Sequence, residues 1–170
     1  AHTADDMAIA CLEAAAGQPA GLLLTIKRAT ILGKTVAYRL EAADAVLFSQ
    51  PLVVQNRAVG YARGCYLPAG SQPPIRCERN LHETPLEPAC CSACCCGPIA
   101  LPSFTTRRYG QPGYAQLRVH TAPELRHWLG DGGEIGAYHN LYQPQREVNI
   151  REAALEYLPL GVNLNVFYVT

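Results

Sequence analysis

The chain has 170 residues, of which 49% are hydrophobic, and equal numbers of basic and acidic residues, 14 each. This length and hydrophobic content predict a single domain, residues 1–170, with a core of its own. Zero net charge argues against a dedicated nucleic-acid binder, whose surface is basic, and removes the repulsion that would oppose self-association. Charged residues are only 16% of the chain. That scarcity is typical of a surface covered by partners and, equally, of a monomer with an uncharged polar surface.

The sequence predicts no membrane span, because it contains no run of about 18 apolar residues. Its first six residues lack the basic and apolar regions of a signal peptide. Ala1 fits the removal of an initiator methionine before a small residue. We therefore expect synthesis in the cytoplasm, with a virion or another large assembly as one destination.

The N-terminal part predicts a helix followed by strands. Thr3 is a suitable helix N-cap and Gly17 a suitable C-cap, so a helix is expected over residues 3–17. A turn at Leu32–Gly33 separates the first two of four expected strands. These strands cover residues 22–31, 34–40, 45–54 and 59–62.

Residues 64–102 form no helical or alternating pattern, and they hold seven of the eight cysteines. They are predicted to be a long, irregular, Cys/Pro-rich insertion that needs cross-links or a partner surface to be ordered. Further along the chain we expect a strand at 115–120, helices at 122–129 and 149–158, and a strand at 162–170. No internal repeat is recognised. The predicted fold class is α+β, a small antiparallel sheet with two or three short flanking helices.

The densest group of cysteines is a seven-residue stretch that contains Cys90, Cys91, Cys94, Cys95 and Cys96. The Cys91-x-x-Cys94 spacing lets two sulfurs converge on one metal, and Cys65 and Cys77, with His82 as a weaker ligand, would complete a site. Zinc and an iron–sulfur cluster are both compatible with this set. Disulfides within or between chains are the alternative, and free thiols are less favoured because they would oxidise. Either linkage would fix the insertion in place.

No enzymatic motif accompanies these cysteines. The sequence lacks a Gly-x-Ser-x-Gly elbow, a His-Glu-x-x-His zinc motif and a phosphate-binding loop. A redox role for Cys91 and Cys94 is disfavoured because no strand and helix flank them. The chain is therefore predicted not to be an enzyme.

Tyrosine is the dominant aromatic residue, with nine copies against three Phe and one Trp. Four tyrosines lie in polar loops that are typical of contact surfaces: Tyr109, Tyr114, Tyr138 and Tyr142. Packing over the rim of an ordinary core is an equally good interpretation of them.

These observations favour a non-enzymatic structural or assembly subunit, such as a phage capsid, neck, tail or baseplate protein. Its expected partners are other protein subunits, identical or different, and neither nucleic acid nor membrane. The alternative is a zinc- or iron–sulfur-binding module with a regulatory or electron-transfer role.

Overall fold

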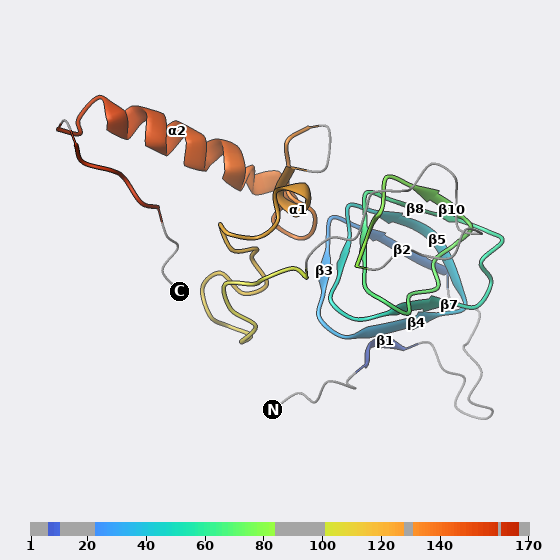
Figure 1. The fold of residues 1–170 in the computed structure, drawn as a ribbon. Coiled ribbons are helices and arrows are strands. Elements are labelled where there is room, and N and C mark those ends of the chain that lie inside the picture. Colours follow the sequence, from blue (N-terminus) through green and yellow to red (C-terminus); the bar gives the residue numbers. More distant parts are fainter. Residues whose placement is uncertain (1–6, 11–22, 84–100, 128–130, 160, 167–170) are drawn as a thin grey trace.

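The computed structural model describes residues 7–10, 23–83, 101–127, 131–159 and 161–166. The chain first winds into a stack of coils, residues 23–82, in which short strands line three faces (Figure 1). We call these residues the coil stack. The segment from residue 101 onward covers one face of the stack and includes a projecting helix, after which the chain runs back beneath it (Figure 1).

Three parallel sheets make up the stack. The first contains β1 (Met7–Ala10), β4 (Lys34–Ala37) and β7 (Leu52–Val54). The second contains β2 (Leu23–Lys27), β5 (Arg39–Asp44), β8 (Tyr61–Arg63) and β10 (Arg76–Glu78). The third contains β3 (Thr30–Ile31), β6 (Leu47–Phe48), β9 (Tyr66–Leu67) and β11 (Leu81–His82). Every pairing between these strands is parallel.

The predicted antiparallel α+β fold is therefore wrong, and the architecture is β-solenoid-like. Alternating apolar and polar residues indicate a strand, but they do not say which strand is its neighbour. Leu32 and Gly33 carry the chain from the third sheet to the first and close no hairpin. Thr30 pairs with Leu47, one coil further along the chain.

The coils form an internal repeat of unequal length, which corrects the expectation that none exists. In the second sheet Ile26, Ala43, Ala62 and Cys77 are successive partners, 17, 19 and 15 residues apart. The third sheet has the same spacing. Because the period changes at each step, a search for a fixed repeat fails.

The repeat is clearest at the corner between the second and third sheets. Four residues directly follow the strands of the second sheet there, and all have positive φ: Arg28 (49°), Ala45 (55°), Gly64 (61°) and Arg79 (49°). A left-handed residue turns a strand sharply, although it is unfavourable for residues with a Cβ. The backbone ladder continues through the corner, since the amides of Arg28, Ala45 and Gly64 donate to the next coil at 2.8–3.0 Å. We call these four residues the corner positions.

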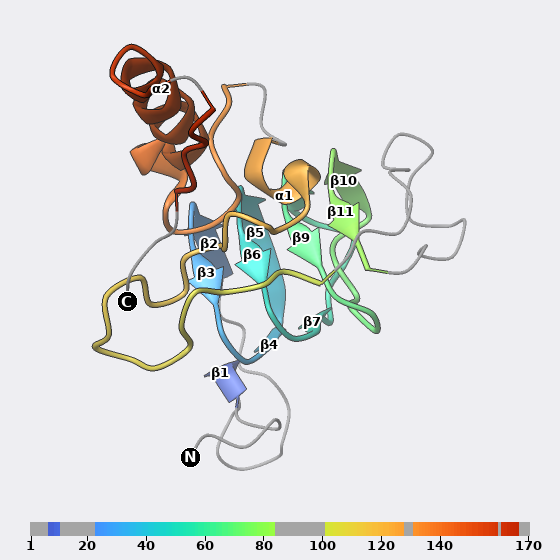
Figure 2. The same ribbon diagram turned by 60° about the vertical axis from the view of Figure 1, so that its left-hand side comes forward.

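Two apolar clusters hold the molecule together. The first fills the inside of the stack and includes Leu40, Val46, Phe48, Leu52 and Leu67. The second lies outside the third sheet, where Leu47, Tyr66 and Leu81 pack against the segment that follows. That segment contributes Phe104, Leu117, Leu125 and Ile135. Figure 2 shows it crossing the strands of the third sheet.

The C-terminal half contains two described α-helices, α1 (Pro123–His127) and α2 (Gln143–Leu155). The short 3-10 helix His139–Leu141 precedes α2. The helix predicted at 122–129 is confirmed over its described residues. The second predicted helix is also present, but it begins at Gln143, so Asn149 lies inside it and caps nothing.

The remaining predicted elements differ from the structure. Met7–Ala10 is a strand where a helix was expected. Residues 115–120 form only an isolated bridge, Leu117 with Phe104, and residues 161–166 form no strand. The irregular insertion predicted from residue 64 is wrong for residues 64–82, because β9, β10 and β11 continue the coils. Residues 84–100 lie outside the described residues.

Candidate functional site: the corner recess

A recess of about 380 Å³ lies where the corner positions face the segment Asp131–Tyr142. Nine residues line it: Arg28, Asp44, Ala45, Arg63, Gly64, Glu78, Arg79, Asp131 and His139. The two middle corner positions are Ala45 and Gly64, which have little or no side chain. Arg28 and Arg79 stand on the outermost coils, three strand spacings or about 14 Å apart along the stack. The recess therefore has a floor of small residues with an arginine at each end.

One wall of the recess is a column of charges on the second sheet. Lys27, Asp44, Arg63 and Glu78 are successive partners on adjacent coils, so their charges alternate in sign. Arg63 binds Asp44 through two hydrogen bonds, of 3.1 Å from Nε and 3.2 Å from an Nη. The hydrogen bond to Asp44 is the main cause that raises the pKa of Arg63. Opposite charges on adjacent strands stabilise the sheet modestly.

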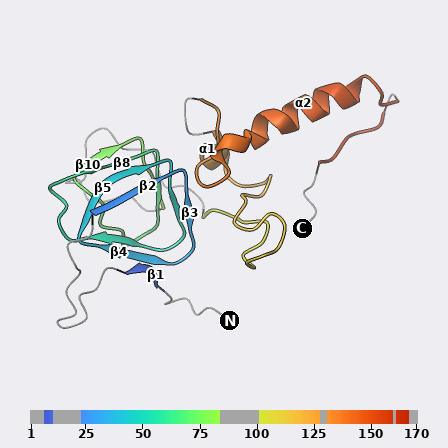
Figure 3. The ribbon, with the colours of Figure 1, turned by 180° about the vertical axis from the view of Figure 1, so that it is seen from behind.

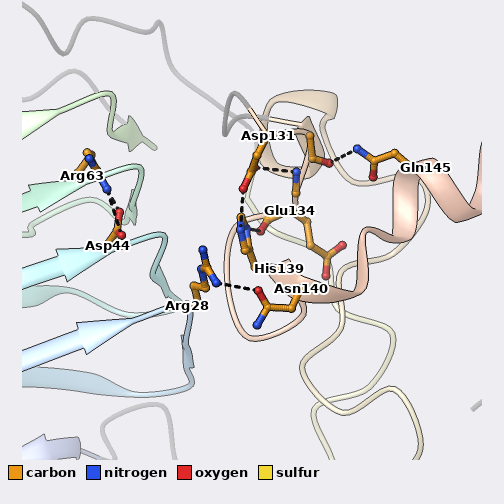
Figure 4. Close-up of polar contacts among 10 residues, drawn as sticks. Arg28, Asp44, Arg63, Asp131, Glu134, His139, Asn140 and Gln145 are labelled. Carbon is orange, nitrogen blue, oxygen red and sulfur yellow. Dashed lines mark hydrogen bonds and ion pairs between the residues drawn. The ribbon is translucent and has the colours of Figure 1, made fainter.

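The opposite wall is built around His139, which is 2% exposed. Its Nε2 lies 3.0 Å from a carboxylate oxygen of Asp131, and its Nδ1 lies 3.1 Å from the carbonyl oxygen of Glu134. Both ring nitrogens therefore face oxygen atoms that accept hydrogen bonds. Figure 4 shows the ring held between them. A hydrogen bond from the backbone amide of Gly133 lowers the pKa of Asp131, and the nearby His139 lowers it further, by a smaller amount. The carboxylate form of Asp131 is therefore favoured.

Backbone and side-chain hydrogen bonds fasten this wall to the coil stack. The amide of Gly136 donates to the Ala45 carbonyl at 3.0 Å, and the amide of Ala137 donates to Oγ1 of Thr30 at 3.0 Å. A Cβ on Gly136 would lie 2.5 Å from that hydroxyl, so only glycine permits the approach. Arg28 donates to the side-chain oxygen of Asn140 at 2.9 Å (Figure 4). The same loop thus closes the recess and joins the two halves of the molecule.

Buried charges continue from this wall into the helices. Glu134 is 2% exposed, and its burial raises the pKa of the carboxyl to about 7, against an opposing effect of Arg126. Arg126 on α1 binds Glu147 on α2 at 2.6 Å, with both side chains largely shielded from solvent. Gln145 donates to the Gly132 carbonyl at 2.8 Å. These contacts all involve the first half of α2.

The side chains of the recess are suited to binding a polar ligand. His139 uses both ring nitrogens for structural hydrogen bonds, so neither nitrogen is placed as a general base. The residues that line the recess include no Ser, Thr or Cys to act as a nucleophile. Guanidinium and carboxylate groups in one concavity can instead recognise a polar ligand, with fork-shaped donors on one side and acceptors on the other.

The described cysteines belong to the interior of the coil stack. Cys65 is fully buried, and burial raises the pKa of its thiol to about 12. The Sγ of Cys65 donates to the Arg63 carbonyl at 3.3 Å and that of Cys77 to the Pro74 carbonyl at 3.0 Å. Both residues pack in the interior cluster. Both side chains therefore lie among the core residues of the stack. Their part in the predicted metal site or disulfides stays a prediction.

His82 occupies the inward position of β11, in register with Leu67. Burial lowers the pKa of its imidazole, which favours the neutral ring. Within the described ranges no three His, Cys, Asp or Glu side chains form a group that could hold a metal ion. Cys90, Cys91, Cys94, Cys95 and Cys96 lie outside those ranges, so the zinc, iron–sulfur and disulfide hypotheses for them stay predictions.

Three of the four tyrosines predicted as partner contacts lie close together. The Tyr109 and Tyr114 rings meet edge to face with centroids 5.5 Å apart, and the Tyr138 hydroxyl donates to the Tyr114 carbonyl at 2.7 Å. Tyr142 lies apart from them, against the ring of His139 at 6.1 Å. Tyr109 is 89% exposed. A contact role for these side chains stays a prediction.

None of the residues that line the recess was predicted as a site residue from the sequence. Arg28 and Arg79 are ordinary charged residues in the linear sequence, and only the coil register brings them to the same corner. The signal that could have found them is the column Lys27, Asp44, Arg63 and Glu78. Each of its members immediately precedes a corner position.

In comparisons with known proteins, no family model, curated protein or solved structure matches this chain. Among the helices of the described ranges, none is long and apolar enough to cross a lipid bilayer.

Proposed function

We propose that this chain is a non-enzymatic structural subunit that associates through its C-terminal arm. The arm comprises α2 and the residues after it, 143–159 and 161–166. Three features support the proposal: a coil stack with its own core, a fixed attachment of the arm to the segment that covers the stack, and apolar side chains along the arm. The third feature carries the proposal.

Within the described ranges, the buried residues of the arm lie near its start. Pro144 and Glu147 are the two buried residues described in α2. The helix has 13 residues and therefore extends about 20 Å. Figures 1 and 3 show it pointing away from the coil stack. Most of its length thus has no packing surface among the described residues.

An isolated helix of this length is marginally stable in water, so α2 should gain from a surface to pack on. The apolar side chains that α2 exposes could pack on such a surface. Ile150 is 54% exposed and Leu155 67%, and Tyr157, two residues beyond the helix, is 84% exposed. Exposed apolar side chains of this size can be buried at a protein interface.

The partner we propose is a second copy of this chain. The formal net charge is zero, so two copies do not repel each other through their overall charge. The arm itself carries both signs, with Arg146 and Arg151 beside Glu147, Glu152 and Glu156. A virion is one kind of assembly in which such a subunit would serve. That assignment stays a prediction.

Sedimentation equilibrium over a range of protein concentrations tests the proposal. We expect the wild-type chain to self-associate, and the double variant Leu155→Asp, Tyr157→Ser to remain monomeric at the same concentrations. Ile75→Asp is the matched control, because Ile75 is 54% exposed but lies on the coil stack. It should associate as the wild type does. A wild-type chain that stays monomeric at about 100 µM, or a double variant that associates normally, would contradict the proposal.

A further inference from the structure

We propose that the corner recess is a binding site for a sugar acid, a polyhydroxylated ligand that carries one carboxylate. The inference concerns the second sheet and the loop opposite it, and it is independent of the arm. It rests on the shape of the recess, its charges and the free donors of one arginine.

The shape of the recess follows from the sequence of the corner positions. Long side chains are tolerated at this left-handed corner, as Arg28 and Arg79 show, yet the two coils between them carry Ala45 and Gly64. A hollow remains over the middle coils, and the loop that holds His139 closes its far side. Its volume of about 380 Å³ is within the range of small-molecule sites, roughly 300–1,000 Å³.

The described lining holds three arginines, Arg28, Arg63 and Arg79, and three carboxylates, Asp44, Glu78 and Asp131, beside His139. Arg63 is engaged with Asp44, and Asp131 with His139. The Arg28 guanidinium contacts a neutral amide oxygen, so its charge is the one that a ligand with a single negative charge would neutralise.

Arg28 is the group best placed to receive that charge. Its guanidinium donates to the neutral side-chain oxygen of Asn140, and within the described ranges it has no carboxylate partner. One of its five N–H groups makes that contact, so a fork remains for a carboxylate. A carboxylate can take the place of the water around this exposed guanidinium. The bidentate pair that would form is among the strongest that an arginine side chain makes.

The acidic residues of the recess indicate why the ligand should also carry hydroxyl groups. Glu78 and Asp131 offer carboxylate oxygens, which can only accept hydrogen bonds. A simple anion such as phosphate would be repelled by them and would donate little in return. The hydroxyls of a sugar ring donate to such oxygens, so a sugar acid satisfies both kinds of group in the lining.

Calorimetric titration of the full chain with sodium glucuronate tests the assignment. We expect one site per chain, with a Kd near or below ~1 mM. Glucose tests the need for the carboxylate, and inorganic phosphate tests the need for the hydroxyls. Both should bind at least ~10-fold more weakly than glucuronate.

Two variants locate the binding. Arg28→Gln should weaken glucuronate binding about 10-fold or more, because a charge-assisted bidentate contact is lost. Arg76→Gln, an exposed arginine on β10 outside the lining, should bind as the wild type does. Both side chains are exposed, so the thermal unfolding midpoint should stay unchanged and will verify folding. Undetectable glucuronate binding, equal binding of glucose or phosphate, or equal weakening by both variants would overturn the proposal.

Discussion

The coil stack and the C-terminal segment, residues 101–127, 131–159 and 161–166, are stabilised in different ways. The stack encloses an apolar interior and joins every coil to the next by a parallel ladder. The C-terminal segment has no sheet of its own, and its apolar side chains pack on the outside of the third sheet. Its attachment therefore depends on the stack, whereas the stack has its own interior. The coil stack therefore sets the shape of the molecule, and the C-terminal segment is the half that is available for contacts.

The largest effect is expected inside the stack. Phe48 is fully buried in the interior cluster, so Phe48→Ala should lower the free energy of unfolding by about 3–5 kcal/mol. Ile150→Ala, on the exposed part of α2, should change it by less than about 0.5 kcal/mol. Urea unfolding followed by circular dichroism measures both. Similar losses from the two substitutions would remove the distinction between the two regions.

A smaller, pH-dependent effect is expected from Glu134 in the C-terminal segment. Burial raises the pKa of this carboxyl to about 7, above its unfolded value of 4.5, so the folded protein binds the proton more tightly. The stabilisation by the protonated form is complete below pH 4.5 and is lost as the pH rises to about 7.

Glu134→Gln removes this titration. The variant should be about 3 kcal/mol more stable than the wild type at pH 8 and close to it at pH 4. Thermal unfolding measured across this pH range provides the comparison, and Glu152→Gln, an exposed position on α2, is the control. A wild-type stability that rises between pH 4.5 and pH 7, after subtraction of the control, would show that Glu134 is not buried as described.

The smallest effect concerns the corner positions. Ala45 has a φ of 55°, which is unfavourable for a residue with a Cβ. Ala45→Gly should therefore raise the free energy of unfolding by about 0.5 kcal/mol, despite the flexibility that glycine adds to the unfolded chain. Ala43→Gly, two residues earlier within β5, should lower it by about 1 kcal/mol or more. Equal losses at the two positions would mean that the corner conformation carries no strain.

The sequence predicted local structure better than it predicted which strands pair with each other. Strand-forming residues around Leu24 and Val36 correctly indicated strands, and the helix predicted at 122–129 matches α1 over its described residues. Nothing in these local patterns distinguishes a hairpin from two successive faces of a coil, because both need a turn after a short strand. The long-range register of Ile26 with Ala43 is a property of the stack as a whole.

The candidate site was harder to predict for the same reason. The clustered cysteines are recognisable because they are adjacent in the sequence, whereas the recess is built from residues on four different coils. Cys65 and Cys77 are small apolar side chains of the interior, a role that their spacing does not reveal. A corner occupied by Arg28, Ala45, Gly64 and Arg79 has no common residue type. Only the shared backbone conformation identifies it.

Hydrogen exchange at low and high protein concentration tests the central claim most directly. We expect amides of the coil stack, such as those of β5 and β8, to exchange slowly and at the same rate under both conditions. Amides from Val148 to Leu158 should exchange rapidly at low concentration and become protected at high concentration, as copies associate through the arm. Exchange in the arm that is independent of concentration, or protection gained in the coil stack instead, would contradict the account.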